Sequence, residues 1–141
     1  MIRRLLSIAA LAVALMVGLA APASAAEVFT TDLQGEEEVP RLGDLDGSGF
    51  AVVVAIPEAG LVCYAIVVYD VNPINAAHIH EARRGVAGPV VVPLDPPTNG
   101  ASGGCVADQA EANDIAADPS DYYVNVHNAE FPGGALRGQL G

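Results

Sequence analysis

The sequence contains no lysine and no tryptophan, and its six arginines face seventeen acidic residues, which gives a formal net charge of −11. Nucleic acids and anionic membranes attract proteins through clusters of positive charge. A chain this poor in cations is therefore not expected to have either of them as a partner. Its 141 residues fit one domain with a modest core.

An apolar run that approaches the length of a membrane span occurs only at the start of the chain. Residues 5–21 are almost all apolar; two arginines precede them, and Pro22 and three small residues ending at Ala25 follow. This three-part pattern is typical of a secretory signal peptide. We expect residues 1–25 to be removed and residues 26–141 to form a secreted or cell-envelope domain without a membrane span; a retained anchor is the alternative.

Cysteine is also scarce: the chain has Cys63 and Cys105, and no CxxC spacing. Exported proteins meet oxidising conditions, so a single disulfide between these residues is the simplest expectation. It would stabilise the fold by about 3 to 4 kcal/mol through loop closure. A reactive thiolate or a metal ligand is the alternative.

Short runs of valine, isoleucine, tyrosine and alanine recur with glycine, proline, asparagine and aspartate between them. This pattern predicts an all-β fold, an antiparallel Greek-key or immunoglobulin-like β-sandwich of about seven or eight strands. The expected strands cover residues 27–34, 48–56, 61–70, 75–81, 88–93, 121–128 and 135–140. Residues 94–104 are rich in proline and glycine and are expected to form a long exposed loop. One short helix or helical turn is expected before the strand at 121–128.

The segment "DPSDYY" places Asp118 four residues before Tyr122, at the start of an alternating strand. This arrangement resembles the tyrosine corner of immunoglobulin-like Greek keys. In that case the valines of the strand point into the core with Tyr122. Asn125 and His127 then share the opposite face, because side chains alternate across a strand.

The three histidines of the chain have the same alternating setting. His78 and His80 flank Ile79 in "AAHIHE", and His127 ends "YYVNVH". With Ile79 in the core, both imidazoles lie on the face away from it, about 7 Å apart at Cβ. A third imidazole from a neighbouring strand would complete three nitrogen ligands, a set that suits copper or zinc.

Three further polar residues lie near these histidines in sequence: Glu81, Asn125 and Glu130. They are expected to orient an imidazole or to supply an oxygen ligand. The alternative is that the histidines form only a polar patch with cross-strand hydrogen bonds. The acidic run at 35–40, "GEEEVP", is expected to be a solvated edge, and Arg137 is expected to pair with an acidic residue on the sheet.

Three blocks of the sequence, at 33–40, 76–94 and 122–140, resemble the conserved blocks of the CHRD domain, named after chordin. The resemblance implies a secreted β-sandwich domain, and in some bacterial members a cysteine pair like the one here. The positions that match the family motif are Glu38, Val39, Pro40, His78, His80, Gly85, Gly88, Pro89, Tyr123, Asn125, His127, Gly133, Gly134, Arg137 and Gly138.

A weaker similarity concerns the copper/zinc superoxide dismutases, which place copper on an outer sheet face through a His-x-His strand. His78 and His80 match that motif, with His127 as a third ligand from another strand. The sequence lacks a bridging histidine, the zinc-binding loop and a fourth copper histidine. Its negative charge would also slow the approach of a superoxide anion.

From these observations we expect a non-enzymatic extracellular binding module, with copper or zinc at His78, His80 and His127 if a metal is bound. An extracellular protein or a glycan is the other expected kind of partner. A copper-dependent dismutase-like enzyme and a purely structural or adhesive envelope domain are the alternatives.

Overall fold

The computed structural model describes residues 25–141. The predicted signal peptide, apart from its last residue, lies outside this described part. None of the helices between residues 25 and 141 is both long and apolar enough to cross a membrane.

Eight strands, one α-helix and two short 3-10 helices make up the described part of the chain. The strands are β1 (Glu27–Gln34), β2 (Ser48–Ile56), β3 (Leu61–Tyr69), β4 (Ala76–Glu81), β5 (Val90–Leu94), β6 (Ala101–Ala107), β7 (Tyr122–His127) and β8 (Leu136–Gln139). The helices are α1 (Gln109–Ala117), η1 (Gly35–Glu37) and η2 (Pro119–Asp121).

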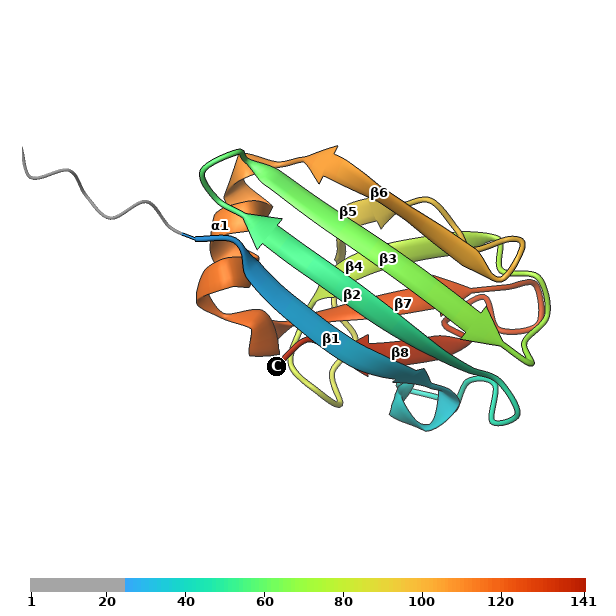
Figure 1. The fold of residues 1–141 in the computed structure, drawn as a ribbon. Coiled ribbons are helices and arrows are strands. Elements are labelled where there is room, and N and C mark those ends of the chain that lie inside the picture. Colours follow the sequence, from blue (N-terminus) through green and yellow to red (C-terminus); the bar gives the residue numbers. More distant parts are fainter. Residues whose placement is uncertain (1–24) are drawn as a thin grey trace, which may run out of the picture.

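All strand pairs are antiparallel, and the hydrogen-bonded order is β5-β4-β7-β8-β1-β2-β3-β6. The sheet folds over into two layers, β1-β2-β3-β6 and β5-β4-β7-β8, as Figure 1 shows. Only the pair Gln34 and Arg137 joins β1 to β8 at the fold line. The predicted all-β Greek-key sandwich is confirmed, in a form close to a barrel.

The hydrophobic core lies between the two layers and follows the two-residue period of the strands. On β4 it takes Ala77 and Ile79, and on β7 it takes Tyr122, Val124 and Val126, all of them buried. Each fully buried aliphatic side chain of this kind contributes about 1.5 to 3 kcal/mol relative to its exposed form. The inward direction of the apolar residues on these two strands is as predicted.

Helix α1 closes one end of the sandwich (Figure 1) and is the helix predicted before β7. It begins after Asp108, whose side chain accepts a hydrogen bond from the Glu111 backbone N–H at 3.1 Å, and it buries Ile115 in the core. Its last residue is Ala117, and the capping residue Asp118 is followed by Pro119, which cannot continue a helix. The Tyr122 hydroxyl makes no hydrogen bond to Asp118 within residues 25–141, so the tyrosine corner stays a prediction.

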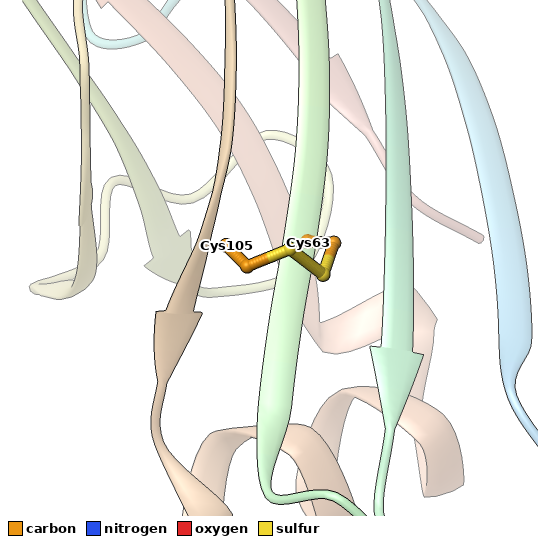
Figure 2. Close-up of a disulfide and its surroundings, with 2 residues drawn as sticks. All are labelled: Cys63 and Cys105. Carbon is orange, nitrogen blue, oxygen red and sulfur yellow. A yellow bond between two sulfur atoms is a disulfide. The ribbon is translucent and has the colours of Figure 1, made fainter.

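The predicted disulfide is present: Cys63 on β3 and Cys105 on β6 are directly opposite each other and bonded, as Figure 2 shows. The predicted loop at 94–104, by contrast, is wrong in its second half. β6 begins at Ala101 and pairs with β3 along its whole length. Gly103 and Gly104 carry no side chains, so this strand has no alternating pattern that the sequence could reveal.

Candidate metal centre

Strands β4 and β7 bring the three histidines together. The strands pair so that His78 is opposite Asn125 and Ala76 is opposite His127, which makes His127 a diagonal neighbour of His78. The ring centroid of His78 lies 5.6 Å from that of His80 and 5.1 Å from that of His127. The centroids of His80 and His127 are 6.0 Å apart. The predicted gathering of all three imidazoles is therefore found.

The nitrogen atoms of this cluster have nearly the spacing of a metal site. One ring nitrogen from each histidine lies within 4.8 Å of the other two. An ion about 2.1 Å from each nitrogen allows separations up to about 4.2 Å. The observed spacing exceeds this limit by about 0.6 Å, so the imidazoles would have to move closer together to share one ion.

Backbone carbonyls orient two of the three rings. Nδ1 of His80 lies 2.9 Å from the Gly88 carbonyl oxygen, and Nδ1 of His127 lies 3.1 Å from that of Pro132. A carbonyl oxygen only accepts hydrogen bonds, so each Nδ1 carries the proton and each Nε2 keeps its lone pair. This is the usual arrangement behind metal-ligating histidines.

Three of the remaining four ring nitrogens, one from each histidine, are buried without a hydrogen-bond partner. They are Nδ1 of His78, Nε2 of His80 and Nε2 of His127. Burial lowers the pKa of all three imidazoles, and for His80 and His127 the neighbouring histidines lower it further. The rings are thus held in the neutral form that binds metal ions.

The sheet face that carries the histidines is covered, although the prediction describes it as outer. His80, Tyr123 and Asn125 are 8%, 3% and 2% exposed. The segment 82–89 lies over this face: the Gly88 N–H donates to the Tyr123 hydroxyl at 3.1 Å, and its carbonyl meets His80. The imidazoles do point away from the core, but His80 is buried under this segment, whereas His78 and His127 are half-buried.

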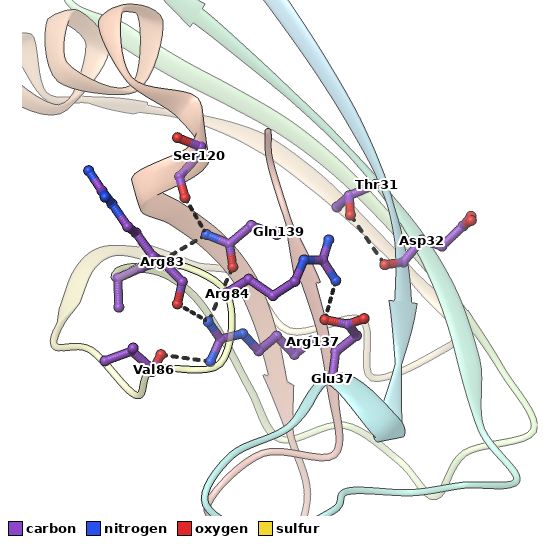
Figure 3. Close-up of polar contacts among 10 residues, drawn as sticks. Thr31, Asp32, Glu37, Arg83, Arg84, Val86, Ser120, Arg137 and Gln139 are labelled. Carbon is purple, nitrogen blue, oxygen red and sulfur yellow. Dashed lines mark hydrogen bonds and ion pairs between the residues drawn. The ribbon is translucent and has the colours of Figure 1, made fainter.

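Tyr123 connects the histidines to a buried arginine. Its ring stacks on His80, with centroids 4.8 Å apart and planes 11° apart, and the Arg137 guanidinium carbon lies 3.5 Å from the centroid of the same ring. Arg137 donates to the carbonyls of Val86 and Arg83 at 2.8 and 3.0 Å and to Gln139 Oε1 at 3.2 Å (Figure 3). Its predicted pairing with an acid is therefore wrong, because carbonyls and an aromatic ring hold it.

Glu38 is a buried residue of this layer that reasoning from the residues alone missed. It is 5% exposed, and its Oε1 accepts a hydrogen bond from Asn125 Nδ2. Burial raises its pKa to about 7, although the hydrogen bond and the Arg137 charge act in the opposite direction. Part of the predicted solvated acidic edge is therefore interior. The match of Glu38 to the family motif was the one signal in the sequence that distinguished it from Glu36 and Glu37.

Two of the three predicted accessory residues have hydrogen-bond partners other than the histidines. Asn125 is engaged by Glu38 and by the Leu136 carbonyl at 2.9 Å. Glu130 accepts a hydrogen bond from Asn72 at 2.9 Å, and Glu81 is exposed. Neither carboxylate belongs to the group of ligand atoms formed by the histidines.

Fold and site together define an antiparallel Greek-key β-sandwich with a disulfide on one layer and a three-histidine cluster on the other. The model of the CHRD domain family matches residues 29–140, and the chain belongs to this family. Comparison with curated proteins and with solved structures gives no match.

Proposed function

We propose that this protein is a secreted CHRD-domain binding module that holds one copper or zinc ion through His78, His80 and His127. Two observations support this most directly: one ring nitrogen of each histidine lies within 4.8 Å of the other two, and each histidine has a buried ring nitrogen without a hydrogen-bond partner. Buried polar atoms without partners are rare in folded proteins. A single ion would provide a partner for all three at once.

The chemistry of the cluster favours copper and zinc over harder ions. Neutral imidazoles suit Cu²⁺ and Zn²⁺, and copper binds more tightly in the order of divalent affinities. Three neutral ligands leave a coordination position that a water molecule can fill. The disulfide is consistent with the oxidising compartment that secretion implies.

Binding is favoured over catalysis because the ligand nitrogens are almost inaccessible, which restricts substrate access to an ion there. Seventeen acidic residues also repel a superoxide anion. A copper-dependent dismutase-like enzyme and a purely structural or adhesive envelope domain are the competing proposals.

Calorimetric titration of the purified protein with Zn²⁺ and Cu²⁺ tests the proposal. We expect one ion per chain, and at least about a 100-fold loss of affinity in His78→Ala, because a first ligand matters more than an orienting residue. Glu81→Gln and Glu130→Gln are matched controls and should bind like the parent protein. Circular dichroism checks that each variant is folded.

The absence of binding by the parent protein, or equal binding by a folded His78→Ala variant, would contradict the metal site and favour the structural domain. A dismutase assay of the copper-loaded protein distinguishes the binding module from the dismutase-like enzyme. Rates no higher than those of the metal-free protein support the binding module, whereas rapid copper-dependent turnover favours the enzyme.

A further inference from the structure

The outer face of the β1-β2-β3-β6 layer is apolar, although it lies on the surface. By alternation from the buried residues it carries four or five residues of each strand. Its members are Val28, Thr30, Asp32, Gln34, Ser48, Phe50, Val52, Val54, Ile56, Leu61, Cys63, Ala65, Val67, Tyr69, Ala101, Gly103, Cys105 and Ala107. We call this set the apolar face. Only Asp32 among them carries a charge.

Large hydrophobic side chains on this face reach solvent. Val28 is 61% exposed, Tyr69 59% and Phe50 39%. Figure 1 shows this layer from outside, with α1 at one end and no described element in front of its centre. An antiparallel sheet with one solvated face normally alternates apolar and polar residues. β2 and β3 instead read as near-continuous apolar runs, which is typical of strands covered on both sides.

We propose that the apolar face is the contact surface between two copies of this chain. Two of its strands have nine residues each, and at about 3.3 Å per residue and 4.8 Å between strands four strands cover roughly 550 Å². Two copies then bury roughly 1,100 Å², just above the minimum of about 1,000 Å² that a biological interface should clear. The face is thus large enough for a dimer of two packed sheets.

Charge favours a second copy over a charged partner. The apolar face offers no cation and a single anion, so it has no complement for an acidic or a basic surface. A second copy needs no such complement, because two twisted sheets interdigitate apolar side chains at about 10 Å. The acids elsewhere on each copy repel one another over longer range. The dimer is therefore expected to tighten as salt screens that repulsion.

Sedimentation velocity of the purified protein over a range of concentrations tests this inference. Ala65 is exposed near the centre of the face, opposite Val52, so Ala65→Lys introduces a charge there without disturbing the core. We expect the parent protein to form dimers and Ala65→Lys to weaken them by about tenfold or more. Ala87→Lys is the matched control, because Ala87 is an exposed alanine in the segment that covers the opposite layer. It should dimerise like the parent.

Phe50→Lys, on the neighbouring strand, is a second test should Ala65→Lys fail to fold. A parent protein that stays monomeric at high concentration overturns the proposal. So does a dimer that Ala65→Lys and Phe50→Lys leave intact, or one that salt dissociates. Monomers that bind zwitterionic phosphatidylcholine vesicles, and lose this binding in Ala65→Lys but not in Ala87→Lys, would assign the face to lipid instead.

Discussion

Replacing Glu38 with glutamine should stabilise the protein at neutral and alkaline pH. Glu38 is buried, and its pKa is raised from 4.5 to about 7. A carboxyl whose folded pKa is raised stabilises the fold in its protonated form. This contribution is complete below about pH 4.5 and is lost as the pH rises through about 7. Glutamine is neutral at every pH and keeps the oxygen that accepts the Asn125 hydrogen bond.

The size of the effect follows from the two pKa values. The difference between 4.5 and about 7 corresponds to up to about 3 kcal/mol of unfolding free energy. Glu38→Gln should therefore match the parent near pH 4 and exceed its stability by up to about 3 kcal/mol near pH 8. The histidines change the stability of both proteins in the opposite sense. Their lowered pKa makes their contribution complete above 6.5 and lost as the pH falls, so it cancels in the difference.

Urea denaturation followed by circular dichroism, with the disulfide intact, measures this difference at each pH. Glu36→Gln is the matched control, because Glu36 is exposed two residues away in the same acidic run. Its unfolding free energy should stay parallel to that of the parent protein. The unfolding free energy of Glu38→Gln could instead stay parallel to that of the parent protein at every pH, or fall below it above neutral pH. Either result would refute the conclusion that burial destabilises the Glu38 carboxylate.

Three further predictions concern other parts of the structure. Zinc affinity measured by calorimetry should hold to somewhat below pH 6.5 and then fall, because the lowered pKa of the three histidines keeps them neutral to lower pH. Gly134→Ala should lower the unfolding free energy, measured by urea denaturation, by at least about 2 kcal/mol. Gly134 has φ +144°, and an added Cβ would strike the Glu38 carboxylate. Gly133→Ala is the control: an added Cβ there meets open space, and the loss should be less than half as large. Replacing Cys63 and Cys105 together by serine should lower the unfolding free energy by about 4 kcal/mol, since the bond spans a sequence separation of 42, and an unchanged denaturation midpoint would argue against this.

The parts of the structure that follow a two-residue period were predictable from sequence. Ile79 between two histidines predicts an inward isoleucine and two imidazoles on the other face, and the structure has this arrangement. What covers that face was not predictable. The carbonyls of Gly88 and Pro132 orient two of the imidazole rings. Every residue has a backbone carbonyl, so the sequence does not indicate which carbonyls will contact a side chain. The place of Glu38 in the interior likewise depends on the loop path after η1.

The apolar face shows a second limit of alternation. On β2 and β3 apolar residues occupy both the odd and the even positions. The pattern therefore predicts the strands but not which of their two faces is buried. Burial resolves this: Val53 and Ile66 are in the core, whereas Val52 and Ala65 face out. An apolar residue at an outward position is thus recognised only once the layers are known. For this reason the proposed dimer surface could not be inferred from the sequence.

The metal proposal and the dimer proposal can be tested independently because their surfaces lie on different layers of the sandwich. The histidines are on β4 and β7, and the apolar face belongs to β1, β2, β3 and β6 (Figure 1). A dimer through the apolar face leaves the histidine layer turned away from the contact. Ala65→Lys should therefore bind zinc with the affinity of the parent protein, and His78→Ala should keep the parent's dimerisation constant. A metal requirement for dimerisation would show that the histidines take part in the contact, and it would move the interface to the β4-β7 side.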